Sequence, residues 1–219
     1  MPKPLRRDLA EGRADYLAEL RTAVPLFLRF EGPPFGRDPE AAPKLDAFVR
    51  WAQDVLESHG GLLIGVNLGD KGSYLNGAFG APITHEDDAA RAVAAASVLV
   101  APPASLPWIR NLGAGLGRGR MRAGTIGASM RRTYAVLGHQ GNLAAHLMAL
   151  ASDGEVLVDR ALLDGVGPSH RFVSRGEHLV KGQSTPIAVF AHAGRGSSRP
   201  VEGEPSGEET RPIGRAEVL

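Results

Sequence analysis

The sequence predicts an α+β fold in which helices pack on a mostly antiparallel sheet. Strand-like and helix-like segments between residues 24 and 192 begin in the order β, α, β, β, α, β, the ferredoxin-like or split-βαβ pattern. Apolar residues make up 43% of the 219 residues, which is typical of a globular protein with its own core. The 28 glycines and 16 prolines predict many tight turns between short elements. Because unrelated functions share this pattern, it predicts a fold and no activity.

The first elements follow from hydrophobic spacing. Residues 5–23 have apolar residues on roughly one side of a helix, and the run VPLFLRF over residues 24–30 indicates a buried strand. Residues 44–58 carry an apolar stripe at helical spacing and end before two glycines, so they predict an amphipathic helix. Residues 62–68 and 74–79 are expected to form the two strands of a hairpin around a Gly-Asp-Lys-Gly turn.

The second half of the chain alternates in the same way. A helix is expected from Thr84 to about Val100, since a capping-box-like start with acidic residues precedes an alanine-rich run. Residues 109–117 and 119–126 predict a glycine-rich pair of strands, and residues 141–151 predict a further helix. The remaining expected elements are a short helix at 160–163 and short strands at 133–137, 155–159, 172–173 and 188–192.

Composition divides the chain into three parts. Residues 1–23 are the expected helical lead-in, and residues 24–193 are expected to form one domain. Residues 194–210 are rich in Gly, Ser, Pro and Glu, which is typical of a flexible linker. Hydrophobic residues return over 211–219, so the segment 194–219 is expected to lead into a following domain.

Composition also excludes several classes of protein. The absence of cysteine excludes disulfide scaffolds, thiolate zinc sites and cysteine nucleophiles. The 25 basic and 24 acidic residues give a net charge of +1, which argues against a nucleic-acid-binding protein. No apolar run reaches the roughly 18 residues of a membrane span, and the N-terminus lacks the apolar stretch of a secretory signal. A cytoplasmic location without a membrane partner is therefore expected.

Several short motifs have ordinary explanations. The string GAGLGRG over 113–119 has dinucleotide-like spacing, but a strand follows it where such a site needs a helix, which favours a strand with a bulge. Arginines between residues 118 and 132 could meet phosphates. Few aromatic residues lie among them, so a solvated face or a surface for a nucleotide or partner is favoured. The 7 histidines show no metal-binding spacing, and no GxSxG hydrolase motif is present.

Three segments, taken in order, resemble a known family. They are GGLLIGVNLGDKGSYLNGAFGAPITHEDDAARAVAA (60–96), RRTYAVLGHQGNLAAHLM (131–148) and LVKGQSTPIAVF (179–190). Together they resemble the class III nucleotidyl cyclase homology domain, most closely the second, degenerate half of tandem soluble adenylyl cyclases. The resemblance covers residues 24–192. It implies a head-to-tail dimer with nucleotide sites at its interface, where two aspartates of one subunit hold two magnesium ions.

The resemblance assigns roles to three residues that keep the family's residue type. Asp70 matches the second metal-binding aspartate, Asn142 the catalytic asparagine, and Lys181 the lysine that binds the polyphosphate. In the family the 3′-hydroxyl attacks the α-phosphate and pyrophosphate leaves. That chemistry needs a metal-activated nucleophile and positive charge around the developing negative charge.

Four further positions depart from the family. Arg29 stands where the first metal-binding aspartate is expected, and an arginine cannot bind magnesium. Val66, or Gly65 with a shift of one residue, replaces the adenine-reading lysine, and Ala135 replaces the second base-reading residue. His146 replaces the catalytic arginine. The loss of one such transition-state donor typically costs about 10²–10³ in rate.

These departures predict a degenerate, dimerising and regulatory cyclase half that is inactive alone. The alternative is a working adenylyl cyclase half, in which a partner supplies both aspartates and His146 imitates the arginine. A nucleic-acid or unrelated binding module is the third possibility. No cofactor is expected for the chain alone, and magnesium only beside a competent half. The expected partner is another cyclase homology domain, and the expected ligand is ATP or a small anion.

Two further expectations follow from the resemblance. An ion pair between Arg29 and Asp70 is expected where the family holds metal, since a guanidinium can meet a carboxylate with two hydrogen bonds. The alternative is that Arg29 points to solvent. Residues 211–219 resemble the start of AAA-like signalling ATPase domains, so such a domain is expected to follow.

Overall fold

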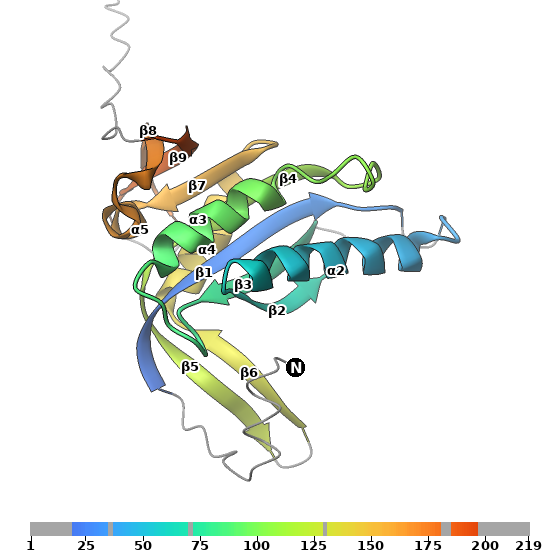
Figure 1. Cartoon of the computed structure of the whole chain (residues 1–219), viewed down its shortest axis with the longest axis horizontal. Coiled ribbons are helices and arrows are strands. Elements are labelled where there is room, and N and C mark those ends of the chain that lie inside the picture. Colours follow the sequence, from blue (N-terminus) through green and yellow to red (C-terminus); the bar gives the residue numbers. More distant parts are fainter. Residues whose placement is uncertain (1–18, 35–36, 70–71, 129–130, 181–184, 197–219) are drawn as a thin grey trace, which may run out of the picture.

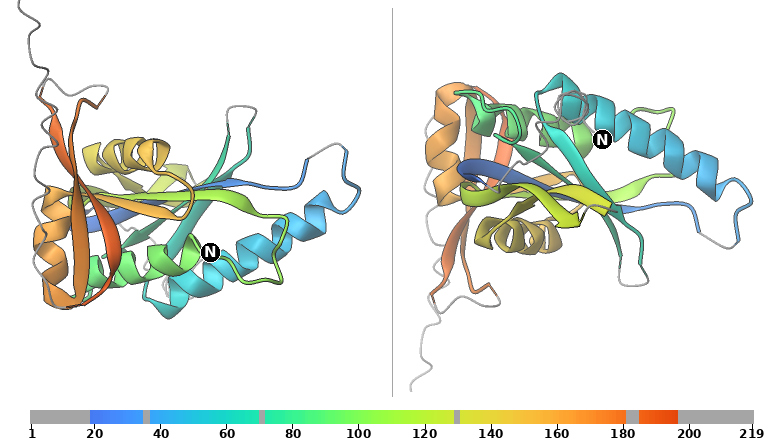
Figure 2. Two further views of the ribbon diagram at one scale, coloured as in Figure 1. Left: turned by 90° about the horizontal axis from the view of Figure 1, so that it is seen from above. Right: turned by 90° about the horizontal axis from the view of Figure 1, so that it is seen from below.

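The computed structural model describes residues 19–34, 37–69, 72–128, 131–180 and 185–196. In these residues a nine-stranded mixed sheet carries helices on both faces (Figures 1 and 2). The strands are β1 (Glu19–Glu31), β2 (Leu62–Asn67), β3 (Ser73–Phe79), β4 (Arg110–Leu116), β5 (Gly119–Ala128), β6 (Arg131–Leu137), β7 (Glu155–Asp159), β8 (His170–His178) and β9 (Ile187–Arg195). The helices are α2 (Ala41–Ser58), α3 (Asp88–Leu99), α4 (His139–Leu150), α5 (Arg160–Val166) and the single 3-10 turn η1 (Gly167–Ser169).

The elements from β1 to β4 follow the order βαββαβ, as the sequence predicts. The main sheet has the strand order β2-β3-β1-β4-β7-β9-β8, so its first part has the ferredoxin-like arrangement with β3 and β1 inside. Neighbouring strands are antiparallel except for the parallel pair β4 and β7. The prediction of an α+β fold with a mostly antiparallel sheet is therefore confirmed.

Strand β1 divides its side chains between the two faces of the sheet. Leu26, Leu28 and Phe30 are buried in the main core beneath α2 and α3, and the Phe30 ring lies 4.6 Å from the Phe48 ring of α2. Arg29 alternates with them and therefore points to the opposite face. Helix α4 covers part of that second face, while α2 and α3 lie on the first (Figure 2, left). Arg29 and α4 thus share one face of the sheet.

The glycine string over 113–119 allows α4 to lie directly on β4. A Cβ atom on Gly115 would lie 2.1 Å from the Met148 amide nitrogen and 2.2 Å from the Ala144 carbonyl oxygen. Only glycine fits at such a distance. The sequence predicts a bulge within this string, but Gly113–Leu116 pairs in regular register with both β1 and β7, and the register shift lies just before it, between the pairs Arg29–Gly113 and Glu31–Arg110. The string is a packing surface for α4.

Two sequence predictions about the strands are wrong. Residues 19–23, expected to end the N-terminal helix, are strand, because Glu19–Ala23 pairs with Gly119–Ala123 of β5. Strands β4 and β5 do not pair with each other, since β4 lies between β1 and β7 while β5 pairs with β1 and β6. Strands β5 and β6 form a ribbon that extends from the body of the molecule (Figure 1). The rest of the expected lead-in, 1–18, and most of the expected linker, 197–219, lie outside the described residues.

Helix α3 begins four residues after the expected start at Thr84. The Asp88 carboxylate accepts hydrogen bonds from the His85 amide (2.9 Å) and lies 3.1 Å from His85 Nδ1, which fixes residues 84–87 as a turn before the helix. The described helices include none that is long and apolar enough to cross a membrane.

Candidate functional site

Arg29 lies within the sheet on β1, between β3 and β4, and its side chain is half-buried against the end of α4. Its Nη2 donates to the Ala151 carbonyl oxygen (2.9 Å) and to Asn111 Oδ1 (3.0 Å). Its Nη1 and Nε make longer hydrogen bonds of 3.4 Å to the carbonyl oxygens of Met148 and Asn111. All three guanidinium nitrogens therefore donate to acceptors of the chain itself.

The guanidinium closes the C-terminal end of α4. The last carbonyl groups of a helix lack partners within it and carry the negative end of its dipole. The Arg29 guanidinium, which is permanently charged and carries several N–H donors, hydrogen-bonds carbonyl groups at this end and places a positive charge at the negative end of the dipole. Gly113 makes room, because a Cβ atom there would lie 3.1 Å from Arg29 Nη2. Asn111, whose backbone has a left-handed φ of 52°, contacts the other side of the guanidinium. Its Nδ2 donates to Glu31 Oε1 at 2.7 Å.

Two predicted site residues, Asp70 and Lys181, lie outside the described residues. The strands that flank Asp70 do form the expected hairpin, since β2 and β3 are antiparallel neighbours. The ion pair between Arg29 and Asp70 stays a prediction, although the Arg29 guanidinium does not point to solvent. Within the described ranges, no group of three or more His, Asp or Glu residues is placed to hold a metal ion.

Asn142 and His146 lie about one helical turn apart on α4, so their side chains project from the same side of the helix. Asn142 is exposed and His146 is half-buried. Asn142 lies near the start of α4, whereas His146 lies nearer its end, two residues before Met148, whose carbonyl oxygen accepts from Arg29. The opposite, buried side of the helix consists of Leu143, Ala144 and Leu147.

The two predicted base-reading positions are apolar and lie on different strands. Val66 is on β2 opposite Leu75 of β3, and its side chain is 37% exposed. Ala135 is buried on β6 opposite Gly124 of β5. Neither side chain contains a hydrogen-bond donor or acceptor, so neither can read the edge of a base.

A cleft of about 470 Å³ lies beside the start of α4, between α4, α5 and β9, and sequence analysis missed it. Gln140 lines it, and Gln140 Oε1 is buried without a hydrogen-bond partner among the described residues. Asp159 lines it too and caps α5 by accepting from the Leu162 amide at 2.9 Å. Burial raises the pKa of Asp159 to about 6. An aspartate directly before a helical turn is the signal that could have identified this cap.

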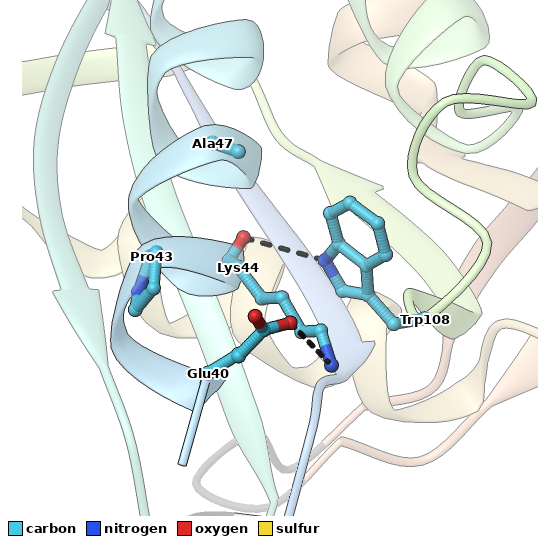
Figure 3. A pocket seen from close by; sticks show the side chains of 5 residues that line it. All are labelled: Glu40, Pro43, Lys44, Ala47 and Trp108. Carbon is cyan, nitrogen blue, oxygen red and sulfur yellow. Dashed lines mark hydrogen bonds and ion pairs between the residues drawn. The ribbon is translucent and has the colours of Figure 1, made fainter. Parts of the chain in front are cut away.

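A smaller groove of about 250 Å³ lies on the other face of the sheet, at the start of α2 (Figure 3). Trp108 Nε1 donates to the Lys44 carbonyl oxygen at 3.3 Å, and Lys44 Nζ lies 3.7 Å from the Glu40 carboxylate. These contacts occupy the polar groups that line the groove, and none of the predicted site residues lines it. The candidate site is therefore the face that carries Arg29 and α4.

Solved structures with a similar fold are cyclase domains. The adenylyl cyclase CyaB from P. aeruginosa matches with a TM-score of 0.72 and 19% identity, covering 81% of this chain and 96% of that one. The guanylyl cyclase Cya2 matches with a TM-score of 0.70 and 24% identity, covering 86% and 96%. The guanylate cyclase domain of RhGC from Catenaria anguillulae, solved in complex with GTP, matches with a TM-score of 0.70 and 17% identity, covering 81% and 100%. No protein-family model and no curated protein matches the sequence.

The chain therefore has the class III nucleotidyl cyclase fold, as the resemblance of its three sequence segments implies. At identities below 25% this likeness defines the fold alone. What the chain does must be argued from its own residues.

Proposed function

We propose that the chain is a catalytically degenerate cyclase homology domain, a dimerising and regulatory half in cyclic-nucleotide signalling. The observation that carries this proposal is the guanidinium of Arg29, at the position that corresponds to the first metal-binding aspartate. Arginine stays protonated in proteins and repels a divalent cation. Because its short hydrogen bonds to Asn111 and Ala151 make it part of the packing of α4, Arg29 has a structural use at this position.

The described residues around Arg29 do not fit magnesium. Magnesium is usually bound through one or two carboxylates together with water and substrate phosphates. The groups that surround the Arg29 guanidinium are backbone carbonyl groups and the side-chain amide of Asn111, and they already accept hydrogen bonds from this cation. No cofactor is therefore proposed for the chain alone, and magnesium would enter only beside a partner that brings its own aspartates.

The remaining departures support the same proposal. The apolar side chains of Val66 and Ala135 provide no contact that would select a base. His146 at the position of the catalytic arginine removes a permanently charged donor, and such a loss typically costs about 10²–10³ in rate. With a metal ligand missing as well, the chain paired with itself would have no measurable turnover.

The proposed partner is another cyclase homology domain, in a homodimer or a pseudo-heterodimer. Large apolar side chains are exposed on β2, at the start of β1 and on the β5–β6 ribbon, which supports an interface that an isolated chain leaves open. These residues are Leu20, Val66, Ile126 and Leu137. The proposed ligand is ATP or a small anion, rather than a nucleic acid, and the proposed location is the cytoplasm.

A working adenylyl cyclase half is the second candidate, and the exposed Asn142 with His146 one turn away favours it. Such a half would place Asn142 against the nucleotide, with His146 as the second donor.

Mixing the chain with a cyclase domain that keeps both metal-binding aspartates separates these candidates. Analytical ultracentrifugation reports whether a mixed dimer forms, and cyclic AMP production reports whether the dimer is active. The regulatory half forms a mixed dimer whose output does not depend on Asn142. Loss of cyclic AMP production with Asn142→Ala would favour the working half, and the absence of any mixed dimer at tens of micromolar would contradict both.

A further inference from the structure

Two histidines and a serine form a continuous hydrogen-bonded chain at the far edge of the sheet. His170 begins β8, His192 lies on β9, and Ser97 lies on α3. His170 Nδ1 is 3.0 Å from His192 Nε2, and His192 Nδ1 is 3.0 Å from Ser97 Oγ. His170 is only 6% exposed, and the edge of the Phe172 ring packs against His192. The chain joins the β8–β9 hairpin to the helix that covers it, away from Arg29 and α4.

Hydrogen-bond chemistry fixes the direction of this chain. Ser97 Oγ lies 2.8 Å from the Val93 carbonyl oxygen, to which the serine must donate because a carbonyl group only accepts. The single hydroxyl proton of Ser97 is used in that hydrogen bond, so Ser97 Oγ accepts from His192 Nδ1. A neutral His192 with its proton on Nδ1 has a lone pair on Nε2 and accepts from His170 Nδ1. Both rings therefore carry their proton on Nδ1.

One added proton leaves this chain intact, because His170 protonated on Nε2 still donates from Nδ1, and a neutral His170 with its proton on Nε2 can accept from a protonated His192. A proton on each ring breaks it, since two N–H groups then face each other across the 3.0 Å contact. The site also disfavours the charge: burial and the neighbouring His170 lower the pKa of His192 to about 4. Burial and the charge of Arg195 lower the pKa of His170.

The charged side chains described around His170 and His192 are not placed to stabilise the positive charge of the protonated rings. Arg195 on β9 acts against protonation of His170. The Asp159 carboxylate of β7 is turned to the Leu162 amide, and the Arg160 guanidinium of α5 lies 4.9 Å from the Phe190 ring centre. Arg171 of β8 donates to the Ala193 carbonyl oxygen, Asp164 of α5 is exposed, and Asp88 of α3 is held by His85 at the other end of the helix.

We propose that the Ser97–His192–His170 chain is a pH-sensitive latch, which holds the β8–β9 hairpin against α3 while at least one of the two rings is neutral and releases it when both are protonated. The latch is separate from the nucleotide site and does not depend on the proposed function. A ring with a folded-state pKa below its unfolded value stabilises the fold above about pH 6.5, and this contribution is lost as the pH falls. With its pKa near 4, His192 alone raises the unfolding equilibrium constant about 30-fold between pH 8 and pH 5. Asp159, with a pKa of about 6, lowers that constant about 10-fold over the same range, so the His192 contribution is measured as the difference between wild type and a His192 variant.

The test combines nuclear magnetic resonance of ¹⁵N-histidine-labelled protein with denaturant unfolding from pH 8 to pH 5. We expect the spectra to show His170 and His192 both protonated on Nδ1 at pH 8, with a titration midpoint well below 6.5 for His192 and a lowered midpoint for His170. Hydrogen exchange, corrected for intrinsic rates, should become faster in β8 and β9 before the main core as the pH falls. A ring protonated on Nε2, or an ordinary titration midpoint for His192, would overturn the proposal.

The variant His192→Gln separates a latch from a merely structural contact. Glutamine can accept from His170 and donate to Ser97 but does not titrate in this range. It should keep the hairpin protected at pH 8 and remove the roughly 30-fold contribution of His192 to the pH dependence of unfolding. The matched control is His59→Gln, at the C-terminal end of α2, which should keep that dependence. Equal pH dependence in wild type and His192→Gln would contradict the latch, and His170→Phe gives an independent test if His192→Gln folds poorly.

Discussion

Replacing Arg29 tests directly how the chain uses the position where metal is expected in the family. Arg29→Ala removes the two short hydrogen bonds to Ala151 and Asn111, of 2.9 and 3.0 Å, and leaves the end of α4 without a cation. At about 1 kcal/mol for each hydrogen bond, and 0.3–1 kcal/mol for the helix dipole, roughly 2–3 kcal/mol of stability should be lost. Urea unfolding followed by the fluorescence of Trp51 and Trp108 measures this loss.

Two further variants make the test specific. Arg29→Asp restores the family's residue type, but it places a negative charge at the negative end of the α4 dipole, so it should cost about 0.3–1 kcal/mol more than alanine. The control is Arg50→Ala on α2, which removes an exposed ion pair with Asp46 and should cost about 0–1 kcal/mol. If Arg29→Ala costs no more than the control, or Arg29→Asp is the more stable of the two Arg29 variants, the structural role assigned to Arg29 is wrong.

Three other substitutions have defined outcomes. Gly115→Ala should destabilise the fold by more than about 3 kcal/mol, because its Cβ atom would lie 2.1 Å from the backbone of α4. In Gly154→Ala the new Cβ atom meets no atom within 4 Å, so the cost should be only about 1 kcal/mol, from the positive φ of that residue. Thermal unfolding compares the two variants. Asp159 has a folded-state pKa of about 6, above its ordinary value, so its contribution is fully present at low pH and is lost as the pH rises through 6. Asp159→Asn, which can still cap α5, should therefore gain stability relative to wild type between pH 5 and pH 8 in urea unfolding, and a constant difference would contradict the raised pKa. Asp88→Ala should cost about 1–2 kcal/mol, because the His85 amide before α3 loses the carboxylate to which it donates, and unchanged protection of that amide from hydrogen exchange would show that the bond is dispensable.

Local patterns in the sequence predict most of this fold, because most elements have a clear hydrophobic period. The hairpin over 62–79 and the helices over 41–58 and 139–150 are of this kind, since their own residues specify both type and position. The helix predicted for residues 19–23 was wrong because these residues form a strand through pairing with β5, about 100 residues later. A helical pattern in a short window cannot reveal such a partner.

The candidate site was predictable in its residues but not in its contacts. The resemblance in sequence identifies Arg29, Asn142 and His146 as departures or matches. The partners of Arg29, however, are separated from it by 82, 119 and 122 residues, and they meet only because glycines let α4 lie close to β4. The expected ion pair with Asp70 stays a prediction, and the acceptors that the sequence did not predict are Asn111 and the uncharged backbone carbonyl groups at the end of a helix.

Cyclic-nucleotide production by the purified chain is the most direct measurement of whether it is a degenerate cyclase half. The assay uses ATP or GTP with magnesium or manganese, and compares the chain with its Asn142→Ala variant. Because the resemblance in sequence places Arg29 at a metal-ligand position and His146 at the position of the catalytic arginine, we predict no product above that of the variant. Metal-dependent cyclic AMP or cyclic GMP that disappears in Asn142→Ala would contradict the proposal and show that this chain alone is an active cyclase.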